Sequence, residues 1–290
     1  MCQKLSVLPL ERKNMLAKLG LKASADPKQL ESRLQYHPEV FEFYTSQADF
    51  NSQGLERLEK AIFQVKDQST DKIVLHHPMT FDGEFLEMVT PEKLFPQITH
   101  FLEKSTNDLL QLAFDHDCQV LVHGSYELRN KSIMDYYGNW EKANQELFLR
   151  LDYFAKLGQD HIMFENSISP LFYFGDPTYD QLIYQKGYRL AFDISHSFIK
   201  MQGSNSKLMA SLETLKDHIV HYHLVDSMGE IHDSLPLGQG KIDWSGVLDH
   251  INPEATAIYE IDLKDMNNPL EQLQSHQYLM QVEKTKQNSF

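Results

Sequence analysis

The sequence predicts an α/β protein built as a single (β/α)8 barrel, because short apolar runs alternate with amphipathic segments along the chain. The runs are rich in Val, Ile, Leu, Phe and Tyr, as expected of buried strands. Strands that alternate with helices form a mainly parallel sheet, and eight of them in 290 residues fit a closed barrel. The alternative is an open doubly wound sheet, but its usual glycine-rich phosphate loop, G-x-G-x-x-G after the first strand, is absent.

The eight strand-like runs lie at 16–24, 40–45, 72–77, 119–123, 161–165, 188–193, 219–225 and 256–261. Amphipathic segments between them predict helices at 54–66, 91–116, 140–157, 205–217 and 268–283. Residues 1–14 predict an extra helix ahead of the first strand. We therefore expect one domain over residues 1–290, with residues 1–14 as an N-terminal extension.

Two of these helices have clear start signals. Thr90 precedes Pro91 and Glu92, which predicts an N-cap, a proline at the first helical position and an acid in the first turn. Residues 202–206, QGSNS, predict a turn before the helix at 205–217.

The composition is that of an ordinary globular protein, with 41% hydrophobic and 23% charged residues. No apolar run approaches the roughly 20 residues of a membrane helix, and we recognise no signal peptide. Cys2 and Cys118 form no disulfide framework, so we expect a cytoplasmic protein. The net charge of −14 argues against a large basic surface for nucleic acid, although a local basic patch or bound metal would offset it.

Six consecutive strand runs end in side chains that can bind metal. In order, these are His76 or His77, His123, Glu165, Asp193 followed by His196, His221 with His223, and Glu260. A (β/α)8 barrel brings the C-terminal ends of its strands together at the active site. Crowded carboxylates there would repel one another, and a cation would relieve this repulsion. Mixed histidine and carboxylate ligands suit Zn, Mn, Co or Fe better than Ca, so the sequence predicts a transition-metal centre.

Alternation along a strand narrows some of these assignments. His221 and His223 face the same way, and His223 is the better ligand because it lies nearer the strand end. We expect His221 to be a buried histidine with a hydrogen-bond partner. His76 and His77 face opposite sides, and alternation alone does not choose between them. Asp193 has a second interpretation, as the N-cap of the next helix.

Several motifs together carry a family likeness. They are FENS at 164–167, DISH at 193–196, HYHLVDS at 221–227, LPLGQGKIDW at 235–244 and YEID at 259–262. With these motifs, the chain from about Leu16 onward resembles the xylose-isomerase-like TIM-barrel superfamily. That superfamily contains sugar isomerases and epimerases, and DNA-repair enzymes of the endonuclease IV type.

The epimerase branch of the superfamily uses one metal. The resemblance implies that its ligands here are Glu165, Asp193, His223 and Glu260. It also implies that His196 contacts substrate.

The endonuclease branch uses three zinc ions. The resemblance implies His76 and His123 as the additional ligands, and the His-x-Pro pattern in LHHPM favours His76 over His77. The third zinc of that branch needs an Asp-x-His pair before the glycine loop. Here His232 and Ser234 stand at those two places, which argues against a third metal unless a shift of the loop brings His232 or Asp233 to it.

The stretch LPLGQGKIDW has two interpretations. It forms either a loop that folds over the barrel mouth, which we favour, or a turn shaped by Gly238 and Gly240 with Trp244 in the core. In the first case Lys241 is a candidate to contact substrate.

The first functional hypothesis is a metal-dependent isomerase or epimerase of a small sugar or polyol. One divalent ion (Zn, Mn or Co) would hold two substrate oxygens and stabilise an enediolate, while Glu165 and Glu260 shuttle the proton. The candidate substrate-binding residues are His76, His123, His196, His232 and Lys241.

The second hypothesis is a multi-zinc phosphodiester hydrolase of the endonuclease IV type, with His76 and His123 as second-metal ligands. The third is a barrel that keeps the site for binding alone, because a fold does not fix a function.

Overall fold

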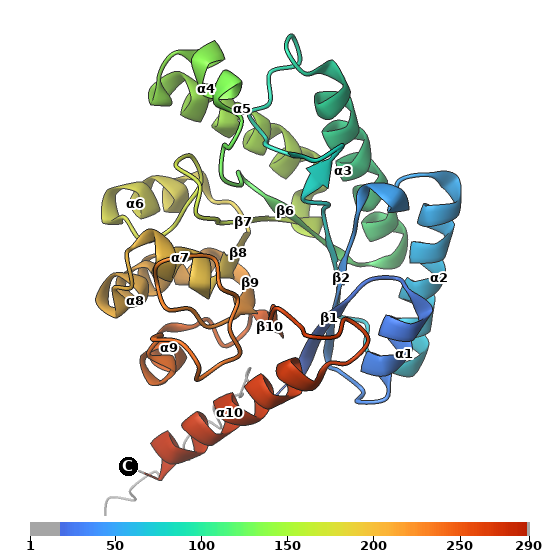
Figure 1. Ribbon diagram of the computed structural model, residues 1–290, viewed down its shortest axis with the longest axis vertical. Coiled ribbons are helices and arrows are strands. Elements are labelled where there is room, and N and C mark those ends of the chain that lie inside the picture. Colours follow the sequence, from blue (N-terminus) through green and yellow to red (C-terminus); the bar gives the residue numbers. More distant parts are fainter. Residues whose placement is uncertain (1–17, 289–290) are drawn as a thin grey trace, which may run out of the picture.

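Eight parallel strands form a nearly closed barrel in the computed structural model, which describes residues 18–288 (Figure 1). The strands are β1 (Gly20–Ala23), β2 (Val40–Tyr44), β3 (Ile73–His76), β6 (Gln119–His123), β7 (Ile162–Glu165), β8 (Leu190–Asp193), β9 (Ile219–Leu224) and β10 (Thr256–Tyr259). They pair in chain order, with β1 and β10 as the two ends of the sheet. These ends meet closely, since a Cβ on Gly20 would lie 1.8 Å from the Ala257 carbonyl oxygen. The predicted (β/α)8 fold is confirmed.

Helices surround the strands on the outside of the barrel (Figure 1). They are α1 (Pro27–Leu34), α2 (Ser52–Gln68), α3 (Pro96–His116), α4 (Lys131–Tyr137), α5 (Trp140–Gly158), α6 (Pro177–Lys186), α7 (Ile194–Lys200), α8 (Asn205–Leu215), α9 (Trp244–His250) and α10 (Leu270–Gln287). Short 3-10 turns are η2 (Gln47–Asp49), η3 (Gln159–His161) and η4 (Lys216–His218), and a small hairpin after β3 pairs β4 (Thr80–Phe81) with β5 (Glu84–Phe85). In the part of the chain described, no helix combines the length and apolar character needed to cross a membrane.

On the side of the barrel formed by β3, β6, β7 and β8, the interior has an apolar layer below a polar one. Val74, Leu121, Met163 and Ala191 form a separate buried cluster, one residue from each of four neighbouring strands. Side chains alternate along a strand, so the residue two positions later also faces inward. This places the ends of those strands directly above an apolar plug, at the C-terminal mouth of the barrel.

The predicted helix at 91–116 begins later than expected, at Pro96. The Thr90 hydroxyl donates to the Glu87 carbonyl oxygen, and the amides of Leu94 and Phe95 donate to Pro91 in a turn. A proline inside a helix removes a backbone donor and clashes with the preceding turn. Pro96 therefore takes the first helical position, and the earlier proline belongs to the turn. The expected helix at 1–14 lies outside the described residues.

Candidate metal centre

Four side chains from the C-terminal ends of four consecutive strands meet at the mouth of the barrel. They are Glu165, Asp193, His223 and Glu260, and one ligand atom from each lies within 4.8 Å of all the others. His223 Nδ1 is 2.9 Å from Glu165 Oε1 and 4.0 Å from Asp193 Oδ2, and it also contacts Glu260 Oε2. The structure thus brings together the four residues predicted as ligands of one metal.

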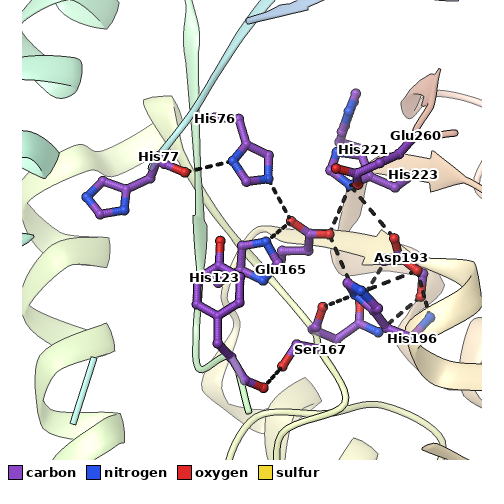
Figure 2. A network of polar contacts seen from close by, with 12 residues as sticks. His76, His77, His123, Glu165, Ser167, Asp193, His196, His221, His223 and Glu260 are labelled. Atoms are coloured by element: carbon purple, nitrogen blue, oxygen red, sulfur yellow. Dashed lines mark hydrogen bonds and ion pairs between the residues drawn. The ribbon is translucent and has the colours of Figure 1, made fainter. Parts of the chain in front are cut away.

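A second group shares Glu165 with the first. His76 Nε2 and His123 Nε2 lie 3.4 and 2.9 Å from Glu165 Oε2. Figure 2 shows Glu165 between these two histidines on one side and His223 on the other. One carboxylate therefore joins two clusters of donor atoms, as a bridging ligand would.

Outer hydrogen bonds fix which nitrogen of each histidine faces the centre. His223 Nε2 donates to Glu42 Oε2 at 2.9 Å, because a carboxylate only accepts. His76 Nδ1 donates to the His77 carbonyl oxygen at 2.8 Å. The inward nitrogens, His223 Nδ1 and His76 Nε2, therefore carry lone pairs when the rings are neutral, as metal-binding histidines require.

The inward atoms fit a divalent cation. Both oxygens of Glu165, Nδ1 of His223 and Nε2 of His76 are buried and have no hydrogen-bond partner among the described residues. His223 Nδ1 nevertheless lies 2.9 Å from Glu165 Oε1, and His76 Nε2 lies 3.4 Å from Glu165 Oε2, so these atoms converge on a shared space. Buried polar atoms without partners are costly, and a set of carboxylate oxygens and imidazole nitrogens suits a divalent transition metal.

The electrostatics of the centre also favour a cation. Burial alone would lower the pKa of His223, but the carboxylates of Glu165, Glu260 and Glu42 raise it well above its usual value. Burial would raise the pKa of Glu165, and the neighbouring His123 and His223 instead hold it well below its usual value. Without metal, a proton on His223 balances the carboxylates; a bound divalent ion would take over that role.

Two charged residues of the centre were missed by the sequence analysis. Lys22 and Glu42 are direct neighbours on β1 and β2, with Lys22 Nζ 2.8 Å from Glu42 Oε1. Lys22 also contacts Glu260 Oε1. The available signal was a charged residue inside each of two short apolar strands, GLKA and VFEFY.

The structure decides between His76 and His77, which alternation along the strand left open. His77 faces outward to α3, with Nε2 2.7 Å from Ser105 Oγ, and burial with the nearby His76 and His123 lowers its pKa to about 3. His76 faces the centre. His221 lies one layer deeper, bonded to Glu42 and Thr256, which confirms it as a buried histidine with partners.

Asp193 combines the two interpretations given to it. Its Oδ1 caps α7 by accepting the His196 amide at 2.7 Å, while its Oδ2 faces His223. His196 donates from Nδ1 to the Asn166 carbonyl oxygen, and its Nε2 lies 2.9 Å from Nε2 of the exposed His232. The His196–His232 pair therefore borders the centre.

The LPLGQGKIDW stretch is held by Asp226, which accepts from the Gly238 and Ile242 amides and from Trp244 Nε1. Trp244 is buried, so the turn-and-core interpretation describes this loop. Lys241 is exposed, and the structure does not bring it into the centre.

No family model matches the chain, and no curated protein sequence matches it. Among solved structures, the chain is similar to a D-tagatose 3-epimerase-like protein, with a TM-score of 0.69 and 17% identity over 94% of this chain and 99% of that one. It is also similar to D-psicose 3-epimerase from Clostridium cellulolyticum H10, solved with D-tagatose (TM-score 0.61, 14% identity, 93% and 98% covered). A third is a xylose isomerase-like TIM barrel protein from Mycobacterium smegmatis in complex with magnesium (TM-score 0.55, 10% identity, 91% and 96% covered).

The chain shares the (β/α)8-barrel fold of these proteins. At these identities the likeness shows the fold, and the activity has to be argued from the site.

Proposed function

We propose that this xylose-isomerase-like barrel is a divalent-metal-dependent isomerase or epimerase of a small sugar or polyol. Glu165, Asp193, His223 and Glu260 would hold the ion, and their mixed oxygen and nitrogen donors suit Zn, Mn or Co. When bound, the ion would supply a Lewis acid that holds substrate oxygens and stabilises negative charge beside the carbonyl.

The observation that carries the proposal is the pair of glutamates on His223. Glu165 is fully buried, whereas the Glu260 side chain is 31% exposed and so reachable from the mouth. Two carboxylates at different depths can act as base and acid, one removing the proton beside the carbonyl and the other returning it. His196 would contact a substrate hydroxyl, supported from outside by His232. The similar psicose epimerase was solved with D-tagatose, which supports a ketose as the first substrate to try.

A second candidate function is favoured by one observation, the His76, His123 and Glu165 group. Two ions sharing Glu165 would suit a phosphodiester hydrolase. The net charge of −14 opposes the binding of a polyanion, and His232 and Ser234 replace the residue types expected at a third zinc site.

The test is the metal content of the purified, untagged protein, measured by element and per chain. We expect one Mn, Co or Zn, together with incorporation of solvent deuterium into a ketose of a sugar panel. Two or three Zn per chain with cleavage of abasic DNA would support the hydrolase instead.

Glu165→Gln tests the ligand assignment, because Glu165 belongs to both groups. We expect it to lose metal and at least about 100-fold in activity, with an unchanged circular dichroism spectrum. The exposed Glu254 provides the control, Glu254→Gln, which should keep both. Full metal content in Glu165→Gln would refute the assignment.

A further inference from the structure

Tyr126 presents a buried hydroxyl that has no partner. It follows β6 by three residues, its side chain is 7% exposed, and no described residue bonds to its phenol oxygen. Other buried tyrosines of this protein do have partners: the Tyr179 hydroxyl donates to Leu171 and that of Tyr188 to Asp152. An unpaired buried hydroxyl is unfavourable in the folded chain alone, so it needs an explanation.

The backbone of Tyr126 is held firmly in place. The buried carboxylate of Glu87 accepts the amides of Tyr126, Glu127 and Leu128 at 2.8–3.0 Å. From the other side, Ser167 Oγ donates to the Tyr126 carbonyl oxygen at 2.6 Å. This loop is therefore fixed at both its amide and its carbonyl groups.

The ring of Tyr126 is fixed as well. It stacks on the His123 ring, with centroids 4.0 Å apart, and on the Phe85 ring at 5.2 Å. Phe85 belongs to the β4–β5 hairpin and itself lies under the Arg129 guanidinium. The hairpin thus helps to fix the orientation of the Tyr126 phenol. The His123 ring, on which Tyr126 stacks, contacts Glu165 in the candidate centre.

The surroundings restrict what the hydroxyl can bind. Burial and the negative charges of Glu165, Glu260 and Glu87 raise the pKa of Tyr126 well above its usual value, so the phenol keeps its proton. A protonated phenol donates a hydrogen bond readily to a neutral oxygen, whereas nearby carboxylates disfavour a phosphate. A fixed hydrogen-bond donor discriminates strongly between ligands that supply the matching oxygen and ligands that lack it.

We propose that Tyr126 is a substrate-binding residue whose hydroxyl donates a hydrogen bond to a carbonyl or hydroxyl oxygen of an unphosphorylated ketose. The proposal rests on the proposed function, since it places this ketose at the same centre. It also assigns the β4–β5 hairpin and Glu87 as positioning elements for substrate recognition.

The test compares Tyr126→Phe with wild type, because this change removes only the hydroxyl and keeps the stacked ring. Binding of D-tagatose, D-psicose and D-fructose to the metal-loaded protein is measured by calorimetry, with turnover measured separately by deuterium incorporation. Metal content and thermal midpoint are recorded for each variant. Tyr188→Phe, at a phenol outside the centre, is the matched control.

We expect Tyr126→Phe to bind its best ketose at least tenfold more weakly, with unchanged metal content and a thermal midpoint equal to or above that of wild type. A purely structural tyrosine would instead lower the midpoint and leave affinity alone. Tyr188→Phe should keep wild-type affinity. Equal affinity in Tyr126→Phe and wild type, or no binding of any ketose to wild type, would overturn the proposal. Ketose binding without turnover would overturn the proposed reaction alone, and the comparison of affinities would still decide the role of Tyr126.

Discussion

Lys22 places a buried ammonium group between two carboxylates inside the barrel. Burial alone would lower its pKa, but Glu260 and Glu42 raise it above its usual value, so Lys22 stays charged. A buried ion pair adds little net stability when it forms, because both charges lose water. Removing one partner is nevertheless destabilising, because it leaves the other charge buried and unpaired. Lys22 is therefore best understood as a fixed counter-charge that keeps Glu42 and Glu260 ionised and in place.

We predict that Lys22→Met lowers the free energy of unfolding by about 3 kcal/mol, because it removes one of the two cationic groups, Lys22 and His223, that contact buried Glu42. Urea unfolding of the chelator-treated protein measures this loss. Added divalent metal should recover part of it by supplying another cation. Lys60→Met removes an exposed lysine that pairs with Glu56 on the surface, and should have no measurable effect. Equal stability of Lys22→Met and wild type would show that the carboxylates are balanced without Lys22.

Asp180 gives a pH dependence that is independent of the centre. It is buried at the start of α6, and burial raises its pKa to about 7, although it accepts the Gly175 amide. The folded state therefore holds a proton that the unfolded chain has already lost above about pH 4. Stability from this group is present below pH 4 and is lost as the pH rises towards 7.

We predict that Asp180→Asn removes this slope. Relative to wild type, the free energy of unfolding of the variant should rise by up to about 4 kcal/mol as the pH increases from 4 to about 7. Above that pH the difference between the two proteins should stay constant. Urea unfolding at a series of pH values measures it. Asp217→Asn, at an exposed position, should show no such change. A difference that does not vary with pH would mean that Asp180 is ionised throughout.

At the scale of elements, the loop after β6 depends on one carboxylate. Glu87 accepts four hydrogen bonds, from the Ser125 hydroxyl and from three consecutive amides that end at Leu128. Leu128 has a φ of +53°, which is unfavourable for a residue with a side chain. The carboxylate therefore holds the loop in a conformation that it would not adopt alone.

We predict that Glu87→Gln destabilises the protein by about 3 kcal/mol, because an amide group would turn a donor towards amides that need an acceptor. Thermal or urea unfolding measures the loss. Ketose affinity should fall as well, since the loop carries Tyr126. Glu84→Gln, on the exposed side of the β4–β5 hairpin, should change neither. Wild-type stability of Glu87→Gln together with weaker ketose binding would show that Glu87 does not stabilise the fold through this loop, which would contradict the prediction.

The strands were predictable and many helices were not, for a physical reason. A strand covered on both faces needs a continuous apolar run, and such runs stand out in the sequence. The missed helices α1, α4, α6, α7 and α9 have 7–10 residues, too few for a clear amphipathic repeat. Two of them did carry a local signal, because Asp26 and Asp176 are N-caps followed by proline.

At the scale of the whole molecule, barrel closure explains which site residues could be foreseen. A closed barrel brings every strand end to one mouth, so barrel geometry predicted that the strand ends from His76 to Glu260 would gather there. The family resemblance then selected Glu165, Asp193, His223 and Glu260 among them. Lys22 and Glu42 lie on β1 and β2 and act across the seam with β10, over a sequence separation of 238 residues from Lys22 to Glu260. A charged residue inside each apolar strand was the available signal, but the contact between them depends on which face of a short strand points inward at the seam.

Closure also means that a metal bound at the candidate centre would connect most of the barrel, since its proposed ligands lie at the C-terminal ends of β7, β8, β9 and β10 and, with His76 and His123, of β3 and β6. A ligand that binds only the folded state stabilises it by about 2.7 kcal/mol at 100 times its Kd. For a domain of 290 residues, that corresponds to a rise in Tm of roughly 4 °C. We predict this fall on removal of metal with a chelator, and recovery with Zn, Mn or Co but not with Ca, which prefers oxygen ligands alone. Calorimetry of wild type and Glu165→Gln measures it. A shift of the same size in Glu165→Gln would place the ion outside the centre, because that variant lacks the carboxylate shared by both groups of ligands.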